Sequence, residues 1–129
     1  MKYDESRLQQ ACVKWFNYQF PDYRGMLFAI PNGGARSAAT GRILKAEGVV
    51  AGVADMILLG RTEDYGCLCI EMKTDKGRQQ ESQKWWQGVA ESLGAKYAVC
   101  RSLEQFIEVV TEHIKKLEEW KKKYEASKG

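Results

Sequence analysis

Apolar residues recur along the chain with two periods, one typical of helices and one typical of strands. Residues 4–19 carry them every three or four positions, which predicts an amphipathic helix capped by Asp4 and ended by Pro21. Its apolar stripe consists of Leu8, Ala11, Cys12, Trp15, Phe16 and Gln19. A short apolar run at residues 26–30 predicts the first strand.

Three further helices follow from the same pattern. Residues 35–47 predict a short helix that ends at Gly48, and residues 81–93 predict one that ends at Gly94. Residues 96–101 predict a strand, after which a capping box at residues 102–105 starts the last helix. That helix continues past Trp120, and residues from about 118 to 129 are expected to form a frayed basic tail. The apolar positions of the three helices are Ile43 and Leu44, then Trp86, Val89, Ala90 and Leu93, then Phe106, Ile107, Val110, Ile114 and Leu117.

A β-hairpin at residues 55–73 organises the chain around it. Two apolar arms flank a polar loop that has Gly60 and Gly66 at its ends. If the hairpin is symmetric about the centre of this loop, Asp55 pairs with Glu71 on one face. Alternation places Cys67, Cys69, Glu71 and Lys73 on a single face, which we expect to pack beneath a helix.

The order of elements is helix, strand, helix, hairpin, helix, strand, helix. This order predicts an α/β fold, with a mixed β-sheet built around the central hairpin and helices on both faces. The 129 residues suffice for one core, and we find no repeat or linker, so residues 1–129 are expected to form a single domain.

Composition places the chain among ordinary globular proteins. Apolar residues make up 44% and charged residues 29%, and no apolar run has the length of a membrane span. The first residues have no apolar signal region, so we expect a cytoplasmic protein without membrane contact. A net charge of +3 permits nucleic-acid binding without arguing for it. The four cysteines lack metal-binding spacing, so they are expected to be reduced and to pack as small apolar residues.

Asp55, Glu71 and Lys73 form the strongest candidate for chemistry. Two carboxylates side by side are unfavourable unless a cation lies between them. Mg²⁺ or Mn²⁺ binds such oxygens together with phosphate oxygens, and a neighbouring lysine can orient water or stabilise negative charge. A plain Glu71–Lys73 ion pair is the alternative interpretation.

Several short motifs surround these three residues in a fixed order. They are Glu5-Ser6-Arg7-Leu8-Gln9, Asn32-Gly33-Gly34-Ala35-Arg36, Leu44-Lys45-Ala46-Glu47-Gly48, Gly52-Val53-Ala54-Asp55, Ile70-Glu71-Met72-Lys73, and Gln83 with Trp86. The set, from about residue 5 to residue 110, resembles the VRR-NUC family, the virus-type replication-repair nucleases of the PD-(D/E)xK superfamily. Ala54 departs from it where the family usually has proline, and Gln80 departs where a serine is common.

The resemblance implies a restriction-endonuclease-like fold and divalent-metal-dependent hydrolysis of DNA. Asp55, Glu71 and Glu5 would be metal ligands for Mg²⁺ or Mn²⁺, Lys73 the catalytic lysine, and Gln83 a glutamine beside the active site. Stand-alone members are typically homodimers that cut branched DNA such as Holliday junctions, which implies DNA repair in a bacterial or phage-infected cell. Without the resemblance, Glu5 is a favourable acid in a helix's first turn and Gln83 a solvent-facing helix residue.

A turn and a short helix supply the predicted DNA contacts. The backbone of Asn32, Gly33 and Gly34, with the side chain of Arg36, is expected to meet phosphates. Arg42 and Lys45 extend this patch unless they form an ordinary solvated face. Two alternatives stay open: a restriction-type endonuclease acting on duplex DNA, and a non-catalytic nucleic-acid-binding module with the same fold.

Overall fold

A four-stranded mixed sheet forms the centre of the molecule, and the computed structural model describes residues 3–31 and 37–128 of it. In chain order the elements are α1 (Tyr3–Gln19), the 3₁₀ helix η1 (Pro21–Tyr23), β1 (Leu27–Ala29), α2 (Ala38–Ala46), β2 (Met56–Leu59), β3 (Cys67–Met72), α3 (Glu81–Ser92), β4 (Lys96–Cys100) and α4 (Leu103–Lys128). The α/β class and the order of elements are as predicted.

The pairing of the strands confirms the predicted hairpin and its register. The sheet order is β1-β2-β3-β4, with antiparallel pairs except for β3 and β4, which are parallel and joined through α3. A parallel pair requires such a crossover connection. Met56 pairs with Ile70, and the same register continued by one residue places Asp55 opposite Glu71.

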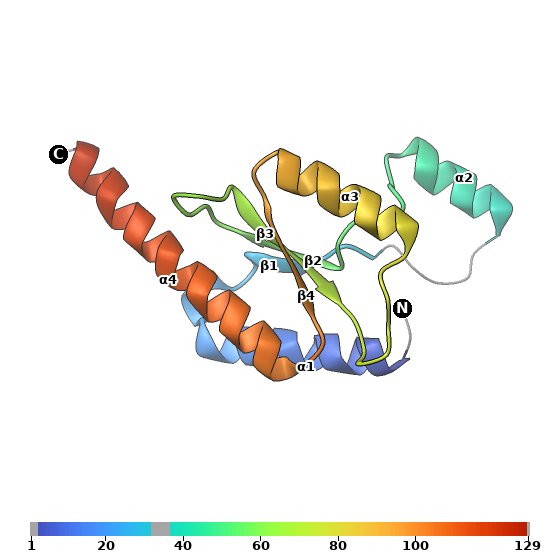
Figure 1. Ribbon diagram of the computed structural model, residues 1–129, viewed down its shortest axis with the longest axis horizontal. Helices are drawn as coiled ribbons and strands as arrows, with labels where there is room; N and C mark the ends of the chain where they lie inside the picture. The colour runs from blue at the N-terminus through green and yellow to red at the C-terminus, as the bar shows by residue number, and fades with distance from the viewer. Residues whose placement is uncertain (1–2, 32–36, 129) are drawn as a thin grey trace.

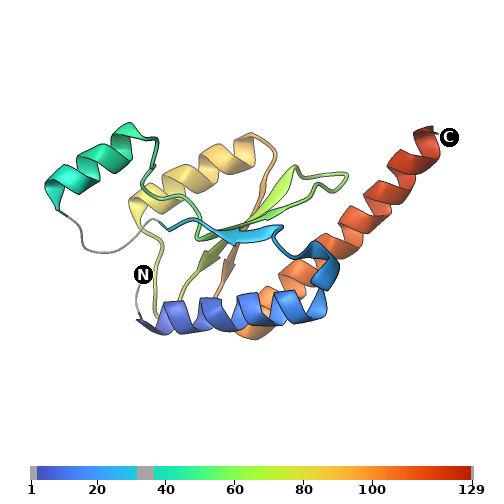
Figure 2. The same cartoon turned by 180° about the vertical axis from the view of Figure 1, so that it is seen from behind.

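The two faces of the sheet bury different residues, and β3 contributes to both (Figures 1 and 2). Leu68, Ile70 and Met72 face α1 and α4, where the larger apolar core lies. Cys69 is only 2% exposed and packs with Ala54 and with Ala90 of α3. The predicted face of the hairpin therefore does lie beneath a helix.

Helices α1 and α4 pack against each other as well as against the sheet. The rings of Trp15 and Phe106 meet edge to face, with centroids 6.1 Å apart. Cys12 and Phe16 are fully buried, whereas Ala11 and Gln19, which we assigned to the apolar stripe, are exposed. These two positions lie at the edges of the apolar stripe, where the surface of the helix turns away from the core toward solvent.

Both of the predicted caps of these helices need correction. Helix α1 already includes Tyr3, so Asp4 lies in its first turn rather than at the N-cap. At the start of α4, the backbone N–H of Gln105 donates to Ser102 Oγ at 3.1 Å, as a capping box requires. The side-chain oxygen of Gln105 accepts from the N–H of Arg101 at 2.7 Å instead of from that of Ser102.

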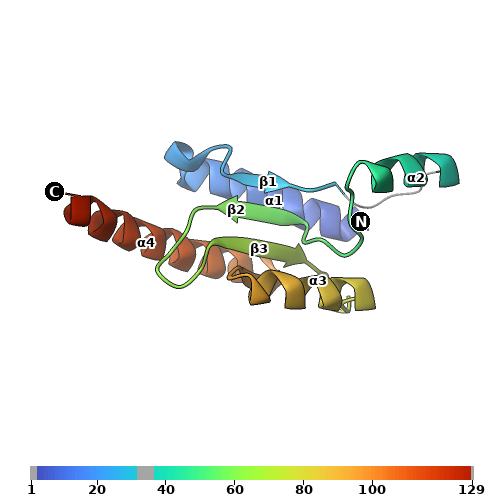
Figure 3. The ribbon, with the colours of Figure 1, turned by 90° about the horizontal axis from the view of Figure 1, so that it is seen from above.

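Helix α4 remains helical to Lys128, beyond the point where we expected a frayed tail. Contacts with the loop of the hairpin explain the difference. The guanidinium of Arg61 lies 4.6 Å from the ring centre of Trp120, and Lys123 pairs with Glu63 at 2.7 Å. The end of this helix projects beyond the sheet (Figure 3). Among the described residues, no helix is both long and apolar enough to cross a membrane.

Helix α2 lies at the other end of the molecule and buries none of its residues (Figures 1 and 3). Ile43, which we placed on its apolar side, is 59% exposed. Ser37 caps the helix, because its side chain accepts from the N–H of Thr40 at 3.1 Å. The pattern thus predicted a helix correctly without predicting whether the rest of the fold would cover it.

Gly52 lets the segment before β2 approach the start of α3. Its φ is +90°, and an added Cβ would overlap the carbonyl oxygen of Ser82 and lie 2.9 Å from the backbone nitrogen of Gln83. Both features exclude a side chain at this position.

We expect Gly52→Ala to lower the free energy of unfolding by about 1–3 kcal/mol, because backbone strain and overlap occur together. Urea unfolding followed by circular dichroism measures this. Gly88→Ala is the matched control, since its added Cβ meets no atom within 4 Å on the exposed side of α3. It should stabilise slightly. An unchanged midpoint for Gly52→Ala would show that the approach to α3 is adjustable.

Candidate active site

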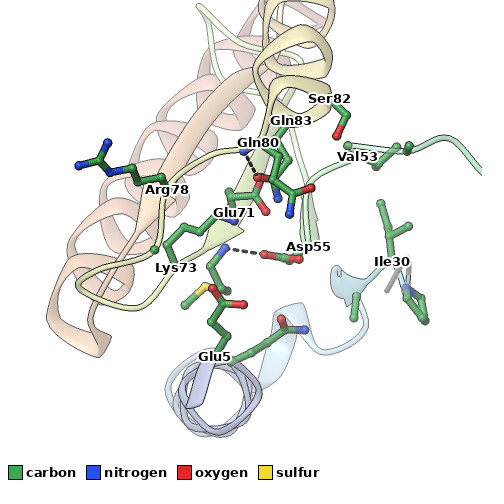
Figure 4. A pocket seen from close by; sticks show the side chains of 17 residues that line it. Glu5, Ile30, Val53, Asp55, Glu71, Lys73, Arg78, Gln80, Ser82 and Gln83 are labelled. Carbon is green, nitrogen blue, oxygen red and sulfur yellow. Dashed lines mark hydrogen bonds between the residues drawn. The ribbon is translucent and has the colours of Figure 1, made fainter. Parts of the chain in front are cut away.

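A cavity of about 860 Å³ opens where the hairpin ends, between α1 and the start of α3. The five predicted catalytic residues all line it: Glu5, Asp55, Glu71, Lys73 and Gln83. They come from four parts of the fold, and Figure 4 shows Glu5 rising from α1 toward the side chains of Asp55, Glu71 and Lys73. Ile30, Pro31 and Val53 form a less polar wall.

Each of the two central carboxylates has one oxygen held by a donor of the protein. Asp55 Oδ2 accepts from the backbone N–H of Met72 at 2.6 Å, which ties β2 to the end of β3. Glu71 Oε2 accepts from the hydroxyl of Tyr97 at 2.7 Å. The other oxygen of Glu71, Oε1, is buried and has no hydrogen-bond partner. The hydrogen bonds therefore fix these side chains while leaving coordinating capacity unused.

The surroundings of Glu71 disfavour its ionised form. The residue is only 1% exposed, and burial together with the nearby Asp55 carboxylate raises the pKa of Glu71 to about 8. The Tyr97 hydroxyl and the Lys73 ammonium act in the opposite direction without cancelling the shift. A carboxylate with this pKa gains strongly from a bound cation, because the cation stabilises its ionised form.

Lys73 and Glu5 meet at the loop that follows β3. Lys73 is 7% exposed, and its backbone N–H donates to the carbonyl of Cys100 at 3.1 Å. A Cβ added at Gly77 would lie 3.4 Å from Lys73 Cδ and 3.5 Å from Glu5 Oε1. The small residue at position 77 leaves room for both side chains at the rim of the cavity. Arg101 holds this loop, donating to the carbonyls of Thr74 and Gly77.

Gln83 has a structural task besides lining the cavity. Its side-chain oxygen accepts from the backbone N–H of Gln80 at 2.7 Å, which completes one half of a capping box at the start of α3. Gln80 stands where the family commonly has serine, but it donates through its backbone N–H, so this half of the cap does not depend on its side chain. Because the oxygen of Gln83 is engaged, its amide NH₂ is the group available to a ligand.

A half-buried hydrogen-bonded chain beyond Glu71 was not predicted from the sequence. The amide of Gln79 donates to Tyr97 Oη at 3.4 Å and to the side-chain oxygen of Gln87 at 2.9 Å. Burial, and then the bond to Glu71, raise the pKa of the Tyr97 hydroxyl well above its usual range, so it stays protonated. The parallel register, which pairs Tyr97 with Cys69, places both on the face of Glu71. The sequence alone does not reveal that register.

The oxygen atoms of this cavity suit a hard divalent cation. In the described part of the chain, two buried side-chain oxygens lack hydrogen-bond partners, Glu71 Oε1 and Gln9 Oε1, and both residues line the cavity. No three His, Cys, Asp or Glu side chains among the described residues form a ready-made metal-binding group. Mg²⁺ is often held by only one or two carboxylates, with water and phosphate oxygens completing its shell. Asp55 and Glu71 therefore fit such an ion.

The structure describes only some of the predicted DNA contacts. Asn32, Gly33, Gly34 and Arg36 lie outside the described residues. Arg42 and Lys45 are exposed on α2, away from the lining of the cavity. Arg78, which sequence reasoning passed over, lines the cavity, and Figure 4 shows its side chain directed away from the carboxylates.

The adjacent tryptophans of α3 differ in exposure. Trp86 is half-buried against Tyr97, with ring centroids 6.2 Å apart. Trp85 is 60% exposed. Trp86 thus helps to position a residue that contacts Glu71.

Without metal, we expect the free energy of unfolding to fall as the pH rises from about 4.5 to about 8. In this window the folded state keeps a proton on Glu71 that the unfolded state has released. The slope from this group is at most about 1.4 kcal/mol per pH unit. Glu71→Gln, which stays neutral, should remove that slope. Urea unfolding in a chelator, with the exposed Glu91→Gln as control, measures it. Parallel pH curves for wild type and Glu71→Gln would contradict the shift.

Comparison with known proteins agrees with the arrangement of fold and cavity. The model of the VRR-NUC domain matches residues 3–104. A solved structure named as a VRR_NUC domain protein superposes with a TM-score of 0.75 and 22% sequence identity, covering 90% of this chain and 92% of that one. No match was found among curated proteins. The family match spans most of the chain and includes the five predicted catalytic residues, so the chain belongs to the VRR-NUC family and has its nuclease-type fold.

Proposed function

We propose that this protein is a divalent-metal-dependent DNA endonuclease. The observation that carries the proposal is the pair Asp55 and Glu71, opposed across two strands, each with one oxygen held by the protein. Lys73 lies buried in the same cavity. A binding module has no need of a lysine beside two acids, whereas phosphodiester hydrolysis uses all three groups.

Asp55 and Glu71 are the proposed ligands of Mg²⁺ or Mn²⁺, with Glu5 approaching from α1. Such an ion, when bound, supplies Lewis acidity and lowers the pKa of a water molecule. The protein's part is to hold the carboxylates in place through the Met72 N–H and the Tyr97 hydroxyl. Glu71 Oε1 has no hydrogen-bond partner and can therefore bind the ion, which is the physical reason that these residues fit it.

Lys73 is the proposed catalytic lysine. A compact ammonium group can orient the attacking water and stabilise the negative charge that develops on the phosphoryl oxygens. Water attacks phosphorus in line, the bond from phosphorus to the 3′ oxygen breaks, and the products carry a 5′-phosphate and a 3′-hydroxyl. Gln83, beside the reacting groups, would donate hydrogen bonds through its amide NH₂.

We expect Lys73→Met to slow metal-dependent nicking of a four-way DNA junction by about 10²–10³-fold, as loss of a group that stabilises transition-state charge does. Glu71→Ala should abolish nicking. Lys76→Met is the matched control, because Lys76 belongs to the same loop, is exposed and lies outside the lining of the cavity. Gel assays with Mg²⁺, Mn²⁺ and a chelator measure the rates. Junction binding without any cleavage by wild type would instead identify a non-catalytic module.

Branched DNA such as a Holliday junction is the substrate we propose, and a homodimer is the proposed active form. A symmetric junction is cut on two strands, which requires two active sites related by a twofold axis. Structure-selective binding relies mainly on phosphate contacts, which exposed basic side chains such as those of Arg42 and Lys45 can make. If the protein instead cuts plain duplex DNA as fast as the junction, and does so at particular sequences, the restriction-type alternative is favoured.

Arg42 and Lys45 are the described basic residues we propose for contact with DNA backbone. Replacing both by glutamine should weaken junction binding at every sequence. It should lower the slope of log affinity against log salt by about 0.9 for each phosphate that the protein no longer neutralises. Lys115→Gln with Lys122→Gln, two exposed lysines of α4, changes the net charge equally and is the control. Equal slopes for the two double variants would remove α2 from the DNA-binding surface.

A further inference from the structure

Tyr97 is a half-buried donor next to the cavity, and its part in the proposed reaction is to hold Glu71. It comes from β4 rather than from the hairpin, and it does not line the cavity itself. Its hydroxyl donates to Glu71 Oε2 at 2.7 Å, while its ring packs against Trp86 at a centroid distance of 6.2 Å. The contact therefore joins the central carboxylate to a rigid part of the sheet behind it.

Two glutamines determine which way the hydroxyl of Tyr97 donates. The amide NH₂ of Gln79 approaches Tyr97 Oη at 3.4 Å and is held by the side-chain oxygen of Gln87 at 2.9 Å. Because a donor faces a lone pair of the phenolic oxygen, the phenolic hydrogen is left for the carboxylate. Donation thus runs outward from Gln79, to Gln87 of α3 on one side and through Tyr97 to Glu71 on the other.

The bond from Tyr97 also selects which oxygen of Glu71 is available. With Oε2 engaged, Oε1 is the oxygen without a partner, and it is buried. A carboxylate that rotated freely would offer either oxygen and would need ordering when a cation binds. A hydrogen bond from behind the ligand removes this freedom and favours the ionised form.

We propose that Tyr97, oriented by Gln79 and Gln87, is a positioning residue that presents Glu71 Oε1 to a divalent cation. This proposal rests on the proposed function, because it assumes that Glu71 is a ligand. It adds a residue outside the hairpin and outside the motifs that identify the family. It also makes the start of α3 and strand β4 part of the metal site, although neither supplies a ligand.

Mn²⁺ binding to the intact protein, followed by electron paramagnetic resonance of the free ion without DNA, tests the proposal. Tyr97→Phe keeps the ring against Trp86 and removes only the hydroxyl. We expect its Mn²⁺ affinity to fall about tenfold at neutral pH, as loss of an outer hydrogen bond to a ligand does. Tyr18→Phe, at a tyrosine 85% exposed on α1, is the matched control and should bind as wild type does.

The outcomes separate the positioning role from the proposed function. If wild type does not bind Mn²⁺, the proposed metal site fails and Tyr97 has nothing to position. If wild type binds, Glu71→Gln does not, and Tyr97→Phe binds as wild type does, then only the positioning role is overturned. If Tyr97→Phe does not fold, Gln79→Met carries the test. It should weaken Mn²⁺ binding by about threefold through a misdirected hydroxyl, and unchanged binding would refute the proposal.

Discussion

The burial of one carboxylate, that of Glu71, governs how the other parts of this fold are placed. An ionised carboxyl group loses most of its hydration when it is enclosed, and it is tolerated only where donors or charges replace the lost water. Three elements respond to this need: β4 supplies the Tyr97 hydroxyl, the end of β3 supplies Lys73, and α3 closes the face above. They do so incompletely, since one oxygen of Glu71 has no partner and its pKa is raised to about 8. Natural proteins keep a buried polar atom without a hydrogen-bond partner at sites where a bound ligand supplies the missing partner.

The alternation of side chains along β3 explains how a polar site and an apolar core share one strand. Leu68, Ile70 and Met72 contact the core formed with α1 and α4, and the residues between them face α3. The charged end of the strand therefore requires no break in the core. A shift of one residue in register would exchange the two faces, burying Glu71 among apolar side chains. The symmetric hairpin around Glu63 fixes the register against that shift.

Those features that depend on local pattern could be predicted from the sequence, and those that depend on distant pairing could not. Asp55 opposite Glu71 follows from a symmetric loop, and the burial of Cys69 follows from parity along one strand. Glu5 and Gln83 required the family motifs, because nothing in the pattern of α1 or α3 aims them at the hairpin. Tyr97 required the parallel register of β3 and β4, which a crossover helix sets and no local signal reveals. The exposure of α2 and the length of α4 likewise depend on what the rest of the chain does or does not place against them.

The partly satisfied site also bears on the choice between an enzyme and a binding module. A module that only contacts phosphates would be more stable with apolar residues in place of Asp55 and Glu71, because neighbouring acids repel each other and burial removes the hydration of Glu71. Positive side chains at the surface would serve its purpose, and α2 already offers two of them. When ionised, the two acids instead repel the anionic substrate as long as no cation is present. A cation between them reverses that repulsion and lets the same cavity accept a phosphodiester. The arrangement is thus unfavourable for binding alone and favourable for metal-assisted hydrolysis, which is why we place the enzyme first.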